Sequence, residues 1–303
     1  MSLLRFLSFV LAFTLVPQTA AAKTWREVNP LVNARPATVA AQGVTVQVVP
    51  MNEIVFEDGE EFEIGSLRVT VTFPGGEPIA VLLDEAVVPT HGLWVGIGKL
   101  GRRDAHPVVI LTGYTGGMHC CVTAQLVTRQ NGQPRVLGLP MMDGDPNTGF
   151  PRDIDGDGMA DILRADDSFL YAFTSYAGSW APPQLWNLRG GEMVDVSAEP
   201  RFAAFWQREA KKVGKPCRRG QVGACAAYAA AMARLGRAEQ GIAEALRNAP
   251  KADWLPEPCT VDLVEDECPE GKALVFGGFE EALRWLLREN GYLRDPAALA
   301  GAD

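Results

Sequence analysis

Apolar and polar positions alternate along the first two thirds of the chain. Residues 44–49 and 66–73 alternate most regularly, and both stretches are rich in β-branched side chains. Alternation of this kind is typical of β-strands with one buried face. Short apolar runs at 79–83 and 93–97, each bounded by turn residues, continue the pattern. We therefore expect a mainly β domain of short antiparallel strands over residues 23–200.

The spacing of the apolar positions lengthens beyond Pro200. Apolar residues now recur three or four positions apart, which indicates amphipathic helices. Gly236 and Gly291 follow two of these stretches and are suited to end helices. Residues 201–303 are therefore expected to form a small helical domain, which makes the whole chain an α+β protein. The expected helices begin near Phe202 and cover residues 225–235, 237–248 and 279–290.

A run of acidic residues separates two of the expected strands. Calcium prefers six to eight oxygen ligands, which a short loop can supply from alternate side chains and a carbonyl. Four carboxylates crowded together would repel one another without a cation, although an acidic surface turn without an ion is the alternative. Gly156 and Gly158 allow the tight turns that such a loop needs. The predicted Ca²⁺ ligands are the side chains of Asp153, Asp155, Asp157 and Asp161 and the carbonyl of Met159.

The loop at residues 153–161 is not an EF-hand, because Arg164 stands where an EF-hand has its bidentate Glu. Its pattern, Asp-x-Asp-Gly-Asp-Gly-x-x-Asp, resembles the calcium loop of FG-GAP repeats, which form the blades of integrin-type β-propellers. That resemblance implies a β domain built like a propeller blade. Residues 99–109 form a weak second copy, but its metal positions lack carboxylates. Two copies are too few for a propeller, so we expect a partial array or a blade-like sandwich.

A second group of candidate ligands follows a glycine-rich stretch that begins at Gly113. His119, Cys120 and Cys121 are adjacent, and imidazole and sulfur ligands suit Cu(I) or Zn²⁺. A thiol redox site is another interpretation. The third is a disulfide, whether vicinal or not, in a glycine-rich turn. This third interpretation is preferred to a metal site, because neighbouring side chains in extended chain point apart and are poorly placed to surround one ion.

The region from Gly113 to Val196 is also similar to an uncharacterised group of exported bacterial proteins. The GGxHCC turn, the acidic loop and the aromatic stretch at residues 169–177 carry this resemblance, together with the tail at 291–293. It implies a fold and an exported location but no activity. The alternating aromatic residues at 169, 171 and 173 are expected to form a buried strand, and a ladder that binds sugars or peptides is the alternative.

The first residues have the features of a secretory signal peptide. Arg5 precedes an apolar stretch at residues 6–16, and Ala20, Ala21 and Ala22 form a small-residue cleavage site. Cleavage after Ala22 would give a periplasmic or secreted protein. No other apolar run approaches the roughly 18 residues of a membrane span. The net charge of −9 argues against a nucleic-acid partner, which requires a basic face.

Six cysteines in an exported chain favour disulfides. Their grouping pairs Cys217 with Cys225 and Cys259 with Cys268. Cys120 and Cys121 are then left to pair with each other or to remain free.

No pattern of a hydrolase is present, because the sequence lacks a nucleophile elbow, a P-loop and an HExxH motif. Asp166 and Asp167 could form an acid and base pair, but they more commonly cap a turn or support an ion site. We therefore expect an exported calcium-binding protein with a binding or structural role toward an unknown protein or carbohydrate, and not an enzyme. The alternative is a periplasmic redox or metal-dependent enzyme centred on His119, Cys120 and Cys121.

Overall fold

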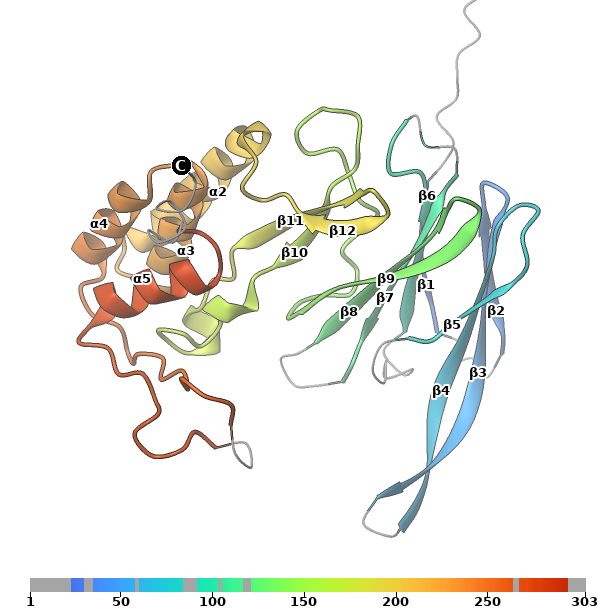
Figure 1. Ribbon diagram of the computed structural model, residues 1–303, viewed down its shortest axis with the longest axis horizontal. Helices are drawn as coiled ribbons and strands as arrows, with labels where there is room; N and C mark the ends of the chain where they lie inside the picture. Colours follow the sequence, from blue (N-terminus) through green and yellow to red (C-terminus); the bar gives the residue numbers. More distant parts are fainter. Residues whose placement is uncertain are drawn as a thin grey trace, which may run out of the picture.

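The computed structural model places three β-sheets at one end of the molecule and the helices at the other (Figure 1). The expected signal peptide lies outside the residues that the structure describes, and for residues 52–57 and 60–66 only the backbone is described. The described residues are 23–29, 35–57, 60–83, 92–102, 104, 106–116, 121–263 and 267–293.

A five-stranded antiparallel sheet forms the middle layer. β7 and β8 lie at its centre, and their side chains are buried on both faces, as expected of strands covered from two sides. The order of its strands is β1 (Thr24–Val28), β6 (Leu93–Gly98), β7 (Val108–Tyr114), β8 (Val122–Gln130) and β9 (Gln133–Met142).

A four-stranded antiparallel sheet covers one face of this middle layer. Its alternating valines point inward. Val44, Val46 and Val48 are fully buried, and they belong to the same core as Val95 and Ile97 of the middle sheet. The regular alternation in the sequence therefore corresponds to the buried face of this sheet. The strands of this sheet are β2 (Ala37–Ala41), β3 (Val44–Glu57), β4 (Glu60–Thr72) and β5 (Ile79–Val81).

A small three-stranded antiparallel sheet packs on the opposite face. Ile162 of its first strand shares a core with Ile110 and Leu126 of the middle layer. The acidic loop leads directly into this sheet, so the loop lies against the middle layer. The strands are β10 (Ile162–Ala165), β11 (Pro183–Arg189) and β12 (Glu192–Asp195).

The helices begin after the short 3₁₀ helix η4 (Pro200–Phe202). The chain is therefore α+β, with antiparallel sheets in its N-terminal part and helices in its C-terminal part. Two disulfides, Cys217–Cys225 and Cys259–Cys268, lie in the helical part, in the pairs that the local grouping favours. The helices are α2 (Ala203–Cys217), α3 (Val222–Arg234), α4 (Ala238–Asn248) and α5 (Phe279–Glu289).

One expectation about the β part stays untested and another is wrong. The sheets of the described residues stack in layers, and their expected likeness to a propeller blade stays a prediction. The predicted aromatic strand at residues 169–173 is wrong, because Phe169 ends the 3₁₀ helix η2 (Asp167–Phe169) and residues 170–174 form turns and bends before the 3₁₀ helix η3 (Tyr176–Gly178). Phe169 and Phe173 are both buried against the helices, whereas Tyr171 is about half exposed and has a positive φ of 57°. The aromatic side chains therefore follow a turning chain and not a flat strand face.

None of the helices in the described part of the chain is both long and apolar enough to cross a membrane.

Candidate metal centre

The acidic loop brings three carboxylates together. One oxygen each from Asp153, Asp155 and Asp161 lies within 4.8 Å of the others. The loop is held in place at its far end, where the amide of Ala160 donates to the carbonyl of Leu100 at 2.7 Å. Three of the four side chains that the sequence predicts as ligands therefore lie close together, and Asp157 is not among them.

Backbone amides of the loop fix the orientation of the carboxylates. Asp153 accepts from the amides of Gly156 at 2.7 Å and Gly158 at 2.9 Å, and both glycines have positive φ. Asp157 accepts from the amide of Met159 at 2.7 Å. Burial pushes the pKa of Asp153 upward, but these amide bonds outweigh it, so the pKa lies below its usual value. The amides of the loop therefore favour the ionised form of Asp153.

Asp161 is the most buried member of the group, with 1% of its surface exposed. Burial raises its pKa, and two hydrogen bonds oppose that rise. The amide of Ile154 donates to Oδ2 at 2.8 Å, and the side-chain amide of Asn187 donates to Oδ1 at 2.8 Å. Asn187 is itself buried on β11. Sequence reasoning missed it, because a lone Asn in a strand 26 residues away carries no signal.

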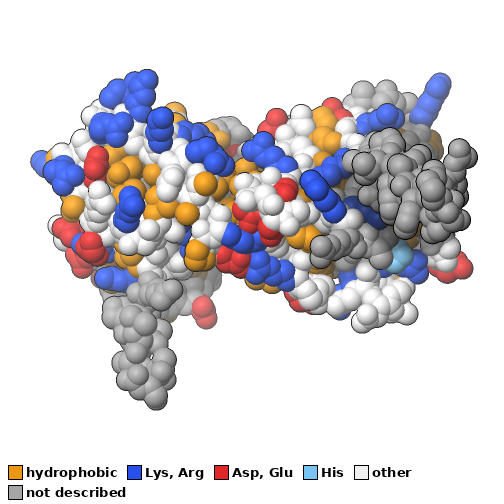
Figure 2. All heavy atoms as spheres, turned by 90° about the horizontal axis from the view of Figure 1, so that it is seen from above, with side chains coloured by type: hydrophobic (Ala, Val, Ile, Leu, Met, Phe, Trp, Pro, Cys, Tyr) orange, Lys and Arg blue, Asp and Glu red, His pale blue; other side chains and the backbone are white. Residues whose placement is uncertain are grey.

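Arg201 reaches into the loop from η4. Its Nη1 donates to Oδ2 of Asp155 at 2.6 Å and to Oδ2 of Asp157, and its Nη2 donates to Oδ1 of Asn187 at 2.5 Å. Its Nε pairs with Glu199 at 2.7 Å. Arg201 is also missing from the site predicted from the sequence, because it lies 46 residues beyond Asp155 in the chain. Figure 2 shows acidic side chains, with basic ones beside them, at the waist between the sheets and the helices.

The donor set fits a hard cation, because every candidate ligand is an oxygen. The side chain of Asp155 is only 2% exposed, whereas that of Asp157 is 39% exposed. Asp157 is outside the group of three converging carboxylates and is held by Arg201. Met159 contributes its amide to the loop, and its carbonyl as a ligand stays a prediction.

The proposed soft-metal or redox group cannot be assembled from the described residues. His119 and Cys120 lie outside them, as does His91. Cys121 is disulfide-bonded, and its backbone amide donates to Oγ1 of Thr115 at 2.9 Å. The interpretation as a site at His119, Cys120 and Cys121 therefore stays a prediction.

Asp166 and Asp167 serve different structural contacts. Asp166 caps η2 and accepts from the hydroxyl of Tyr292 at 2.9 Å, which ties the end of the described chain to the β part. Asp167 accepts from the amide of Asp143, and burial raises its pKa to about 6. Burial also lowers the pKa of nearby Arg164 to about 10, although its guanidinium still donates to the carbonyl of Val122. The two aspartates thus stabilise the boundary between the β part and the helical part.

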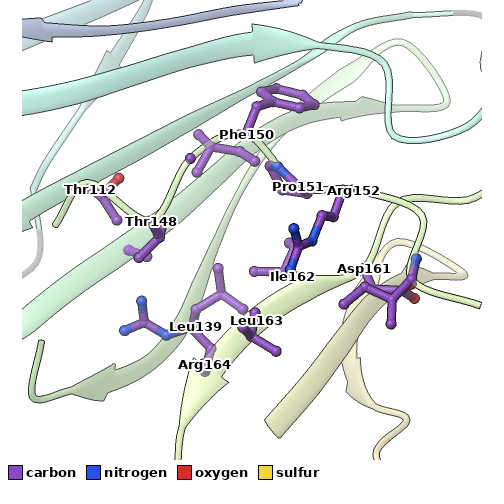
Figure 3. A pocket seen from close by; sticks show the side chains of 14 residues that line it. Thr112, Leu139, Thr148, Phe150, Pro151, Arg152, Asp161, Ile162, Leu163 and Arg164 are labelled. Atoms are coloured by element: carbon purple, nitrogen blue, oxygen red, sulfur yellow. The ribbon is translucent and has the colours of Figure 1, made fainter. Parts of the chain in front are cut away.

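A cavity of about 280 Å³ lies beside the loop, between the middle sheet and the segment that leads into β10 (Figure 3). Its walls are largely apolar, and Asp161 borders one end. The buried hydroxyl of Thr112 on its wall has no hydrogen-bond partner among the described residues. The loop itself is supported by the core between the middle sheet and the small sheet, because Ala160 packs with Leu100 and its amide donates to the carbonyl of Leu100.

Fold and site together define an α+β protein in which an acidic loop of the β part is joined to the first turn of the helical part. Residues 199–291 match the family described as the sll0997 C-terminal domain. The chain is 31% identical over 233 residues to the probable thylakoid lumen protein sll0997 of Synechocystis sp., covering 74% of this chain and 68% of that protein. The chain therefore belongs to the sll0997 family.

A second relative is the uncharacterized protein y4bJ of Sinorhizobium fredii, with 32% identity over 203 residues. The match covers 64% of this chain but only 31% of y4bJ, so the chain spans about a third of that relative. A solved structure of a Xanthomonas type IV secretion system related protein matches with 15% identity and a TM-score of 0.18, over 57% of this chain and 99% of that one. A TM-score this low carries no argument about the fold.

Proposed function

We propose that this chain is an exported calcium-binding protein in which Ca²⁺ has a structural role at the junction of the β part and the helical part. One observation carries the proposal: oxygens of Asp153, Asp155 and Asp161 converge within 4.8 Å. They do so on a loop whose amides already orient them. The resemblance of this loop to the calcium loop of FG-GAP blades supports the same assignment.

Calcium in the loop would supply the positive charge that offsets the mutual repulsion of the carboxylates. Asp153, Asp155 and Asp161 would hold the ion, with Asp157 and the carbonyl of Met159 completing the oxygen ligands. Asn187 would orient Asp161 from outside the ligand set through its 2.8 Å hydrogen bond. The loop and the small sheet of β10 to β12 are then the part of the molecule that resembles a propeller blade.

Three observations support export. The first 22 residues have the pattern of a signal peptide. The two disulfides of the helical part suit an oxidising compartment. The Synechocystis relative is a probable thylakoid lumen protein. We therefore propose a periplasmic or secreted location, and an unidentified protein or carbohydrate as the partner.

A calcium titration of the mature protein tests the proposal. Extracellular calcium modules bind with dissociation constants of roughly 10⁻⁴ to 10⁻³ M. Thermal unfolding followed in chelator and in millimolar calcium should therefore show a higher midpoint with calcium, through preferential binding to the folded state. Asp155→Asn should remove this rise. Asp145→Asn is the matched control, because Asp145 is exposed and lies in a neighbouring loop outside the carboxylate group.

Two results would contradict the proposal. One is an identical midpoint of the wild-type protein in chelator and in calcium. The other is a rise that Asp155→Asn and Asp145→Asn preserve equally, because calcium would then act elsewhere.

A further inference from the structure

We propose that Arg201 is an internal cation that competes with calcium for the acidic loop and thereby sets the calcium affinity. This inference rests on the proposed function. It assigns to a residue of the helical part a role at a site that the β part builds. It also predicts that loss of Arg201 strengthens ion binding, which a purely structural residue would not do.

The contacts of Arg201 put its charge against two of the predicted calcium ligands. A single nitrogen, Nη1, donates to Oδ2 of both Asp155 and Asp157. The Oδ1 atoms of the same two carboxylates accept amides of the loop. Both oxygens of each carboxylate are therefore engaged, one by a backbone amide and the other by the guanidinium. Asp155 must give up or share one of these bonds to coordinate an ion.

Asn187 links Arg201 to the buried side of the site. Its Nδ2 donates to Asp161 and its Oδ1 accepts from Nη2 of Arg201 at 2.5 Å. Arg201 thus contacts the carboxylates directly on one side and through Asn187 on the other. A divalent ion bound by Asp153, Asp155 and Asp161 would lie close to the positive charge of Arg201, and like charges at such distances repel.

The attachment of Arg201 allows this exchange. Its neighbour Phe202 is fully buried in a core with Trp206, which anchors the backbone at the start of the helices. The guanidinium lies at the end of a long side chain that is 24% exposed, and it also pairs with Glu199. Arg201 can therefore leave the loop while remaining paired with Glu199, and the helices need not detach.

Arg189 provides a matched control. It pairs with the same Glu199 at 2.5 Å and lies within 3.5 Å of the same Asn187 oxygen. It forms no described bond with Asp155 or Asp157. Replacing it removes one positive charge from the same cluster and leaves the carboxylates paired with Arg201.

The experiment is isothermal titration of CaCl₂ into the mature chain, as wild type, Arg201→Gln and Arg189→Gln. Removing one positive charge from beside a divalent ion should make binding by Arg201→Gln roughly tenfold tighter than by wild type. Arg189→Gln should stay within about twofold of the wild-type dissociation constant, because its charge is more exposed and more distant. The calcium-induced rise in the unfolding midpoint should be larger for Arg201→Gln than for wild type.

The outcomes separate this inference from the proposed function. Calcium binding by wild type with an unchanged or weaker affinity in Arg201→Gln overturns the role of Arg201 and leaves the calcium site standing. Absence of binding in both proteins overturns both proposals. Should Arg201→Gln fail to fold, Arg201→Lys carries the test, because a lysine keeps the charge but cannot form the same fork of bonds. Its dissociation constant should fall by about two- to threefold, and an equal or larger constant overturns the inference.

Discussion

The core of the helical part and the junction at the acidic loop are held together in opposite ways. The helical core consists of fully buried apolar side chains such as Ala229, Ile242 and Leu283, and a disulfide joins two of its helices. The junction consists of charged and amide side chains that satisfy one another, with Asp161, Asn187 and Arg201 as its centre. Apolar packing is insensitive to ions and pH, whereas a network of charges responds to both. We therefore expect the stability of the helical core to be independent of calcium and pH, and the stability of the junction to depend on both.

Loss of a buried leucine in the helical core should have the largest effect on stability. Leu283→Ala removes a side chain with no exposed surface and should lower the free energy of unfolding by about 3 kcal/mol, since the cavity adds to the lost burial. The loss should be the same in chelator and in calcium. Urea unfolding followed by circular dichroism measures it, with the exposed Leu263→Ala as the control. A loss that depends on calcium would erase the proposed division between the two regions.

Loss of Asn187 should have an intermediate effect and should act at the junction. Asn187→Ala leaves Oδ1 of buried Asp161 without its donor, which should cost about 1–3 kcal/mol. It should also reduce the calcium-induced rise in the unfolding midpoint, because Asp161 is no longer oriented. Thermal unfolding in chelator and in calcium tests both effects. A stability loss with an undiminished response to calcium would place Asn187 outside the ion site.

The smallest effect should come from Asp167 and should depend on pH. Burial raises its pKa to about 6, from an ordinary value of 3.8, so the folded protein binds this proton more tightly than the unfolded chain does. The stabilisation that protonation provides is complete below about pH 3.8 and is lost as pH rises through 6. Asp167→Asn, which is neutral throughout, should therefore be more stable than wild type at pH 8 and similar to it near pH 4.

Urea midpoints of the Asp167→Asn variant at pH 4, 6 and 8 test this prediction, with Asp145→Asn as the exposed control. The difference from wild type should grow mainly between pH 4 and 6 and change little between pH 6 and 8, because both states bind no proton at this group well above the folded pKa of about 6. A difference that is constant across the range would show that the substitution acts through packing and not through the charge of Asp167.

Much of the architecture follows from local patterns. The alternation at residues 44–49 corresponds to the buried valines of β3, and the lengthened spacing beyond Pro200 corresponds to α2, α3, α4 and α5. Gly236 and Gly291 both have positive φ just after helices, as their positions indicated. Such features depend on the periodicity of a few neighbouring residues, and this periodicity is visible without the fold.

The aromatic stretch shows where local patterns mislead. Phe169, Tyr171 and Phe173 alternate like a strand, yet the chain turns twice there so that both phenylalanines reach the helical core. Tyr171 adopts a positive φ to allow this path. Tertiary packing outweighed the local preference, because burying two phenylalanines is worth more than the strain at one residue.

The candidate metal loop also combines features that the local sequence predicts with contacts that depend on tertiary packing. Its four aspartates and two glycines are adjacent in the chain, so residues 153–161 carry their own signal for an ion site. Asn187 and Arg201 belong to the same site only because β11 and η4 fold back onto the loop, from 26 residues beyond Asp161 and 46 residues beyond Asp155. Charges separated this far along the chain interact only when packing brings them within a few ångströms, since solvent screens them at longer range. The candidate ligands are therefore visible in the local sequence, whereas the contacts of Arg201 and Asn187 with the loop depend on the tertiary fold.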